Sequence, residues 1–411
     1  MDETLVKAVV EEGGLGVVVG GGGEAIETKV MDNSSSSSSD SEDANEGGDE
    51  LLLESLERSL ADCPANYDAH VQYIQCLRKL AHFEKLSQAR KSMNEIYPLS
   101  STMWQEWACD ELYANDSVEV FSTIEEIYEK GVLEYLSVPL WCDYLNFVQN
   151  RDPLVVQCAP SGLSKMRSLF ERAITSVGLH FVEGHMVWNA YREFEQAIYH
   201  TIADGSNEEK TKQADRIRAI FHRHLAVPLA DMQSTLLSYK KWEVDLGNIS
   251  NSDSDQLSVL PDNICSLYQK ALEICNTRLP YEDQLLKQDV SETKLQIFMN
   301  YINHEKSWGD PVRVQNLFER AISEFPISSE LWLSYTSYID KTLKVGHLLT
   351  SVYSRATRNC SWVGTLWVHY MLSLERVHSS EKEISLVCSS FSFLFRIVLT
   401  IVFEAVVIGW T

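Results

Sequence analysis

LWLSYTSYI, at residues 331–339, carries the pattern that decides the fold of this chain. Its large apolar side chain, Trp332, is followed three residues later by an aromatic one, Tyr335, and this spacing places both on one face of an α-helix. The pattern occurs seven times, and we name it helix A. Its pairs are Trp104/Trp107, Trp141/Tyr144, Trp188/Tyr191, Leu236/Tyr239, Phe298/Tyr301, Trp332/Tyr335 and Trp367/Tyr370, with Trp242 assigned to the fourth copy as well. Aromatic stripes at this spacing are far more often core than the lining of a ligand groove.

A second pattern, named helix B, lies between these segments. It consists of an aromatic ring, any residue, a basic residue, a small residue and an apolar one. We expect the ring to pack inward and the small residue to leave room for a neighbouring helix. FERAI, the fullest form, occurs twice, and its ring, basic and small residues are Phe170, Arg172, Ala173, Phe318, Arg320 and Ala321. The other copies begin at Tyr128, Phe221, Tyr268 and Tyr353.

Successive copies of helix B are separated by 42, 51, 47, 50 and 35 residues. Segments rich in Pro, Gly, Asn and Ser predict breaks between helices at residues 151–162, 202–212, 248–261 and 280–290. One helix pair cannot bury its aromatic stripe, but stacked pairs share a continuous core. The period therefore predicts an all-α fold, an α-solenoid of about seven or eight stacked antiparallel helix pairs.

Composition divides the chain into three segments. Residues 1–50 hold 13 acidic and two basic residues and a run of six serines, so we expect a disordered acidic leader. Residues 51–385 form the predicted helical array. The repeat pattern then stops, and residues 386–411 are a divergent apolar tail.

The apolar tail has two interpretations. A membrane anchor needs about 20 apolar residues, and residues 391–410 are that long, but Arg396 and Glu404 lie inside and each is costly near a bilayer centre. The alternative is non-repeat sequence read past the array, which we favour because Cys388 stands where the next helix B ring is due. Deleting residues 386–411 is then expected to improve solubility without loss of helicity.

Catalytic, cofactor and metal sites have no support in the sequence. The acids that follow helix A recur with the repeats, whereas a catalytic pair would be unique, so we interpret them as structural partners of basic residues. These acids are Glu111, Glu195, Glu243 and Glu305, and the candidate partners on helix B are Lys130, Arg172, Arg223, Lys270, Arg320 and Arg355. The nine cysteines include no C-x-x-C pair, and the net charge of −24 disfavours binding to a nucleic-acid backbone. We expect no enzyme activity, no cofactor, no metal ion and no small-molecule ligand.

Both patterns resemble the half-a-tetratricopeptide (HAT) repeat. That family is marked by W-x-x-Y-x-x-[FY]-E in its first helix and by A-R-x-[IVL]-[FY]-E-R-A-L in its second. The resemblance is carried by VWNAYREFE at residues 187–195, MRSLFERAI at 166–174 and NLFERAISEFP at 316–326. It implies a superhelix like that of tetratricopeptide repeats.

The resemblance also implies a function, because HAT arrays occur almost wholly in RNA-processing machinery. The acidic leader and the segments at residues 77–107 and 138–148 resemble the members that assemble or recycle spliceosomal small nuclear ribonucleoproteins. Members of the suppressor-of-forked type, which act in mRNA 3′-end cleavage, use the same repeats and are the alternative. The implied partners are spliceosomal or ubiquitin-pathway proteins, with RNA bound only indirectly or weakly. The implied location is the nucleus, with the cytoplasm as a second location because the sequence shows no basic nuclear-localisation stretch. Dimerisation is left open.

Overall fold

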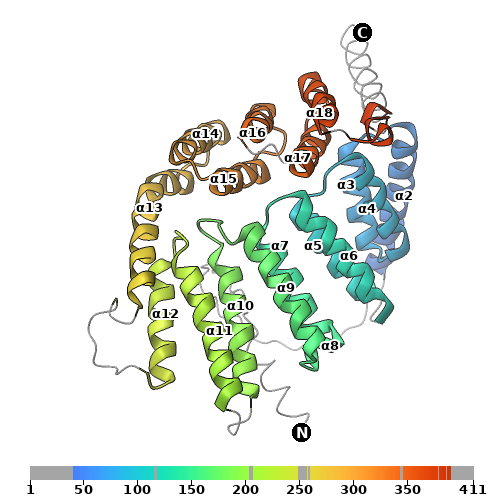
Figure 1. The fold of residues 1–411 in the computed structure, drawn as a ribbon. Helices are drawn as coiled ribbons and strands as arrows, with labels where there is room; N and C mark the ends of the chain where they lie inside the picture. Colours follow the sequence, from blue (N-terminus) through green and yellow to red (C-terminus); the bar gives the residue numbers. More distant parts are fainter. Residues whose placement is uncertain are drawn as a thin grey trace, which may run out of the picture.

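The computed structural model describes residues 40–114, 118–202, 207–248, 257, 260–342, 346–377, 379–385 and 387–389. All regular structure within these residues is helical, and they contain no strand (Figure 1). The prediction of an all-α fold is therefore confirmed. The expectations for the acidic leader before Asp40 and for the apolar tail after residue 389 lie outside the described residues.

The helices form consecutive antiparallel pairs, as the repeat pattern predicts. The pairs are α3 (Tyr67–Lys79) with α4 (Phe83–Ile96), α5 (Ser101–Ala114) with α6 (Val118–Glu134), α7 (Val138–Arg151) with α9 (Pro160–Val177), α10 (His185–Thr201) with α11 (Asn207–Leu225), α12 (Met232–Asp245) with α13 (Asp262–Lys287), α14 (Ser291–Trp308) with α15 (Pro311–Glu324), and α16 (Ser329–Thr342) with α17 (Gly346–Asn359). α2 (Asp40–Asp62) precedes the first pair, α8 (Pro153–Val156) is a single turn, and α18 (Gly364–Arg376) begins a further pair.

The turn between α14 and α15 shows how local sequence ends one helix and begins the next. Gly309 follows α14 with φ of +79°, a conformation that glycine adopts without a Cβ penalty. The Asp310 side chain then accepts a hydrogen bond from the Val312 amide at 3.1 Å, which caps α15. Pro311 occupies the first helical position, where its missing N–H is not needed.

The break predicted at residues 280–290 is confined to residues 288–290, because α13 continues through Pro280 to Lys287. An interior proline costs a helix about 3 kcal/mol. Packing outweighs this cost, since Tyr268 and Cys275 in the first half of α13 are buried against α11 and α12, and Leu285 in the second half is buried against α14 and α15. The segments predicted as breaks at residues 151–162 and 202–212 also contain helix, namely α8 and the first turns of α9 and α11.

α2 begins at Asp40, inside the segment expected to be disordered. Its contacts with α3 account for the difference. The Lys79 ammonium lies 2.5 Å from the Asp49 carboxylate, and the Cys76 thiol lies 3.3 Å from the Asp49 carbonyl. Leu53 and Leu56 add an apolar face that is buried against α3 and α4.

The aromatic residues of helices A and B form the core. Every ring named above for either pattern is buried, as are the small residues Ala173, Ala271, Ala321 and Ala356 of helix B. The ring of helix B stacks on the tyrosine of the following helix A. These pairs are Tyr128–Tyr144 (centroids 5.2 Å apart), Phe170–Tyr191 (4.7 Å), Phe318–Tyr335 (4.8 Å) and Tyr353–Tyr370 (5.7 Å).

The fourth helix B, α13, differs from the prediction. Tyr281, and not Tyr268, stacks on the tyrosine of the following helix A, with its ring centroid 4.9 Å from that of Tyr301. Tyr268 is buried further back, in the cluster formed by α11, α12 and the first half of α13. One long helix therefore serves two successive layers of the stack.

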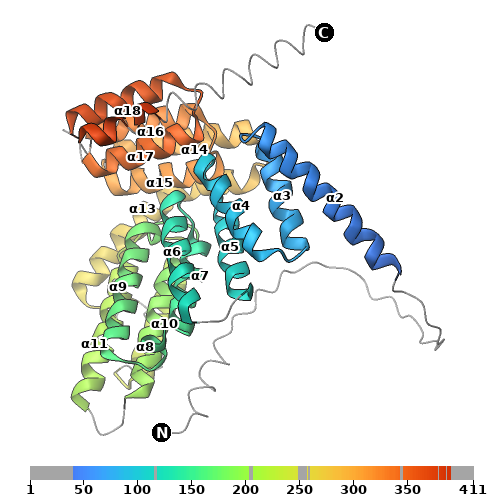
Figure 2. The ribbon, with the colours of Figure 1, turned by 90° about the vertical axis from the view of Figure 1, so that its right-hand side faces the viewer.

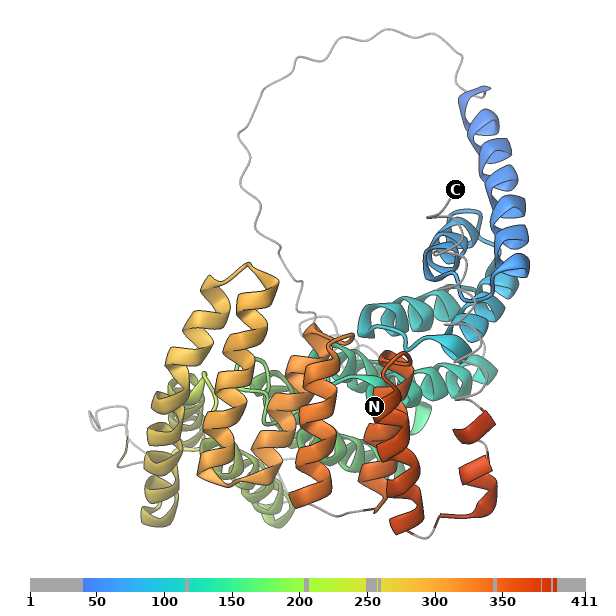
Figure 3. The ribbon, with the colours of Figure 1, turned by 90° about the horizontal axis from the view of Figure 1, so that it is seen from above.

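The array changes direction at α13 and folds back on itself. α2 to α12 form the first half, and α13 to α18 run back along it (Figures 1 and 2). Figure 3 shows the second half from above as a row of neighbouring helices. This arrangement brings α17 beside α4 and α6, which lie more than 200 residues earlier in the chain.

Candidate protein-binding surface and its ion pairs

Consecutive B helices are joined by arginine–glutamate pairs, which we name the B ladder. In each pair both nitrogens of a guanidinium contact both oxygens of a carboxylate. The pairs are Arg172–Glu129 (2.7 and 2.6 Å), Arg223–Glu171 (2.7 and 2.8 Å), Arg320–Glu282 (2.6 and 2.7 Å) and Arg355–Glu319 (2.7 and 2.5 Å). Such paired contacts fix orientation as well as adding energy. The B ladder therefore helps to set the register of α9, α11, α15 and α17, each on the helix B before it.

The position that the sequence pattern left free explains the B ladder. The glutamate is the residue directly after the aromatic ring, as in Phe170-Glu171 and Phe318-Glu319. The arginine follows one residue later and reaches back to the glutamate of the preceding copy. A glutamate in three of the six copies was the signal that could have revealed this pairing.

The acids of helix A pair differently from the prediction. Within the described residues, none of them contacts the candidate basic residues Lys130, Arg172, Arg223, Lys270, Arg320 or Arg355. Three instead bind an arginine that stands three residues before the stacking ring of helix B, which we name the A ladder. Its pairs are Arg167–Glu195 (2.7 and 2.9 Å), Arg218–Glu243 (2.6 and 3.3 Å) and Arg278–Glu305 (2.9 Å for Nη2). Glu111 accepts from the Trp107 indole at 3.0 Å.

The prediction of partners was wrong because helix geometry separates the two arginines. Residues three apart share a face of a helix, so Arg167 points with the Phe170 ring toward the following helix A. Arg172 stands two residues after the ring and points toward a different neighbour, the preceding helix B. The fold thus uses two sets of ion pairs, one from helix B to the following helix A and one from helix B to the preceding helix B.

Both ladders are more deeply buried in the second half than in the first. In the B ladder, the side chains of Arg172 and Glu129 are 48% and 36% exposed, whereas those of Arg320 and Glu282 are 15% and 4% exposed. Exposed pairs contribute about 0–1 kcal/mol, whereas breaking a buried pair is strongly destabilising. The exposed part of the B ladder, Glu129, Arg172, Glu171 and Arg223, is accordingly the part whose charges a partner protein can reach.

The ladders shift the pKa of several carboxyl groups. Burial alone would raise the pKa of Glu319, but the Arg355 guanidinium and the Tyr335 hydroxyl outweigh it, and the pKa is lowered. The hydrogen bond from Arg172 lowers the pKa of Glu129, and that from Arg223 lowers the pKa of Glu171. A folded-state pKa below the unfolded value means that the stabilisation is complete above the unfolded pKa and is lost as the pH falls through the folded one.

We therefore expect the thermal unfolding temperature to fall as the pH is lowered from about 5 to about 3. Glu319→Gln should unfold at a lower temperature at neutral pH and should depend less on pH in this window, since it removes one titrating group. Differential scanning calorimetry at several pH values measures both effects. An unchanged pH dependence in Glu319→Gln would contradict the assignment.

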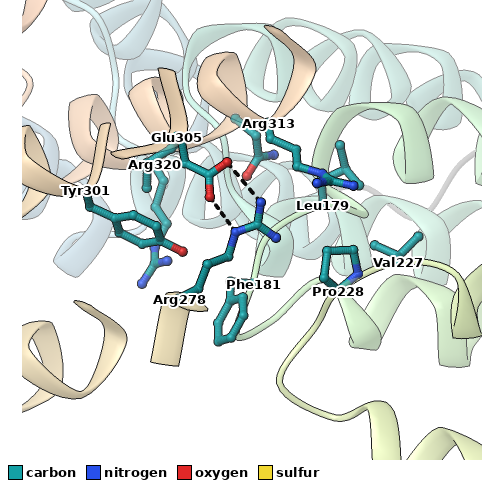
Figure 4. Close-up of a pocket in the computed structure, with 11 residues that line it drawn as sticks. Leu179, Phe181, Val227, Pro228, Arg278, Tyr301, Glu305, Arg313 and Arg320 are labelled. Carbon is teal, nitrogen blue, oxygen red and sulfur yellow. Dashed lines mark hydrogen bonds and ion pairs between the residues drawn. The ribbon is translucent and has the colours of Figure 1, made fainter. Parts of the chain in front are cut away.

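A narrow cavity marks the joint between the two halves (Figure 4). Leu179, Val227 and Pro228 line it from the first half, and the second half contributes three arginines. Arg278 binds Glu305, Arg320 binds Glu282, and Arg313 lies 3.1 Å from Asp310. Burial, together with repulsion from Arg278, lowers the pKa of Arg313. The cavity leaves about 30 Å³ for the centres of water molecules, which is room for a few waters and too little for a small-molecule ligand, so we interpret it as a joint and not as a ligand site.

The described residues offer neither a metal-binding cluster nor a membrane-spanning helix. Their His, Cys, Asp and Glu side chains form no cluster of three or more that could hold a metal ion. None of their helices combines the length and apolar character needed to cross a lipid bilayer.

The chain is similar in sequence to several known proteins. Residues 52–401 match the family described as Suppressor of forked protein (Suf). The human protein named spliceosome associated factor 3, U4/U6 recycling protein, is 35% identical over 336 residues, which are 82% of this chain and 32% of that protein. The Saccharomyces cerevisiae mRNA 3′-end-processing protein RNA14 is 23% identical over 72% of this chain and 45% of its own length. The crystal structure of CstF-77 covers 70% of this chain and 60% of its own, with a TM-score of 0.45 and 15% identity. This chain thus spans about a third of the length of the human relative.

Proposed function

The chain belongs to the Suppressor of forked family, and on that premise we propose that it is a protein-interaction scaffold in RNA processing, acting in the recycling of spliceosomal small nuclear ribonucleoproteins. The observation that carries this proposal is the 35% identity to the human U4/U6 recycling protein over 82% of the chain. The match extends across the array and is not confined to one repeat. A nuclear location follows from the same proposal.

The structure supports a scaffold because the aromatic residues of both repeat patterns lie in the core. The stacked rings hold the helices together, which leaves the outward faces of the array for partners. Spliceosomal or ubiquitin-pathway proteins are the proposed partners. RNA is bound indirectly or weakly in this proposal, since the chain carries a net charge of −24 and backbone phosphates require basic surface.

A scaffold of mRNA 3′-end processing is the second candidate. It is favoured by the family description and by the 23% identity to RNA14 over 72% of the chain. The lower identity makes it the weaker of the two candidates.

Isolation of the tagged full chain from a nuclear extract tests the proposal. We expect U4 and U6 small nuclear RNAs and the proteins of their particles to be enriched over 3′-end cleavage factors. Treating the bound material with ribonuclease should release the RNA but retain the protein partners, because the proposed contacts are between proteins. Enrichment of cleavage factors alone would favour the second candidate, and loss of every protein with ribonuclease would contradict a protein-binding scaffold.

A further inference from the structure

α17 in the second half makes a polar contact with the ends of α4 and α6 in the first half, and Arg358 is its centre. One guanidinium nitrogen of Arg358 donates to both carboxylate oxygens of Glu134 at 3.0 and 2.9 Å. The other donates to the main-chain carbonyls of Asn94 at 2.9 Å and Tyr97 at 3.2 Å, and to the Asn94 side-chain oxygen at 3.2 Å. A single side chain thus joins three segments that are far apart in the sequence.

The acceptors suit a cation. Glu134 is the last residue of α6, and Asn94 and Tyr97 lie at the carboxyl end of α4. Carbonyl groups at the end of a helix have no partner within the helix and lie at the negative end of its dipole. The Arg358 guanidinium supplies donors to the carbonyls of α4 and positive charge to both helix ends.

Two neighbouring contacts reinforce Arg358. The Tyr135 hydroxyl donates to the Asn359 side-chain oxygen at 2.5 Å, and the Tyr135 ring packs against the apolar core of the second half. Arg355, which belongs to the B ladder through Glu319, also donates to the Glu134 main-chain carbonyl at 3.1 Å. The contact is therefore tied to the ion pairs that hold the second half together.

The two halves of the array are therefore joined at two places. One is this contact of α17 with α4 and α6, and the other is the joint at α13. There the chain is continuous, and α13 carries Pro280 in its interior. Away from α13, the apolar cores of the two halves are separate clusters, apart from the Tyr135 ring. Polar interfaces between parts of one chain open more readily than large apolar ones, and the Arg358 side chain is 30% exposed to solvent and hence to salt.

We propose that Arg358, Glu134 and Asn94 form a latch that holds the array closed, and that the second half swings about α13 when the latch opens. Opening uncovers the face of α17 that rests on α4 and α6, together with the ends of those two helices. Resting on the proposed function, the latch regulates which partners the scaffold binds, because these surfaces are reachable only in the open form.

Small-angle X-ray scattering of the full chain tests the latch without any partner, so its outcome is independent of the proposed function. Arg358→Ala should increase the radius of gyration and the maximum dimension, with circular dichroism showing unchanged helicity. Arg172→Ala is the control, because it removes an arginine that also binds both oxygens of a glutamate, but whose partner Glu129 lies in the same half. It should leave the dimensions unchanged. Raising the salt concentration should expand the unmodified chain toward the dimensions of Arg358→Ala and should have little effect on that variant.

Two outcomes would overturn the proposal. One is a scattering profile of Arg358→Ala that matches the unmodified chain while helicity is retained. If Arg358→Ala loses helicity, the same scattering measurement is made on Glu134→Gln, which keeps the shape of the side chain and removes only its charge. Unchanged dimensions in a fully helical Glu134→Gln at low and high salt would then refute the latch.

Discussion

Replacing Trp332 with alanine should lower the free energy of unfolding by about 3–5 kcal/mol. The Trp332 side chain is 0% exposed, and its indole N–H donates to the Pro326 carbonyl at 2.7 Å. Alanine leaves a large cavity beside the Tyr335 ring and leaves that carbonyl without its donor. Chemical denaturation followed by circular dichroism measures the loss.

Trp308 supplies the control, because its side chain is 51% exposed. Trp308→Ala should change the free energy of unfolding by no more than about 0.5 kcal/mol. In a stacked array damage spreads first to the neighbouring pairs, so hydrogen exchange in Trp332→Ala should accelerate first in α14 to α17 and last in α2 and α3, at the far end of the first half. Uniform acceleration over the whole chain would show that the array unfolds as one cooperative unit.

The sequence predicted the core well, because the core depends on periodicity. The two residues of each helix A pair are three positions apart, and residues at this spacing lie on the same face of a helix. The ring and the small residue of helix B likewise fix an inward face. Burial of Trp332, Tyr335 and Phe318 therefore needed no knowledge of the neighbouring pairs.

Partners across helices were not predictable in the same way. Arg172 and Arg167 are both arginines of one helix, and only the packing shows that the first binds Glu129 in the preceding layer and the second binds Glu195 in the following one. The fold-back of the second half onto α4 and α6 has no sequence signal at all. Arg358 and Glu134 are more than 200 residues apart and lie outside both repeat patterns.

The sequence of α13 contains a signal for its second half, but Pro280 outweighed that signal in the prediction. Arg278, Tyr281 and Glu282 have the spacing of Arg167, Phe170 and Glu171, so a second copy of helix B lies within α13. Pro280, directly before the ring, instead favoured a break there. Burial along both halves of α13 decides the conformation, which is a tertiary effect that local propensity does not contain.

The Arg278–Glu305 pair gives the second large effect, since both side chains are more than nine-tenths buried. Glu305→Ala should lower the free energy of unfolding by about 3–5 kcal/mol, because it leaves the Arg278 charge buried without its partner. The other charges at the joint increase the cost of leaving Arg278 without its partner. Arg278, Arg313 and Arg320 line one cavity, and Glu305 is one of the few carboxylates that offset their charge.

Replacing both partners separates the lost charge from the lost packing. Arg278→Met combined with Glu305→Leu fills similar volume without charge, so it should recover most of the stability that Glu305→Ala loses. Glu208→Ala is the exposed counterpart, because the side chains of Glu208 and its partner Lys212 are 83% and 72% exposed, and it should cost no more than about 1 kcal/mol. Chemical denaturation of the unmodified chain and the three variants under one condition compares their free energies of unfolding. If Glu305→Ala costs no more than Glu208→Ala, the buried pair does not neutralise the joint, and the arginines there must be stabilised by solvent instead.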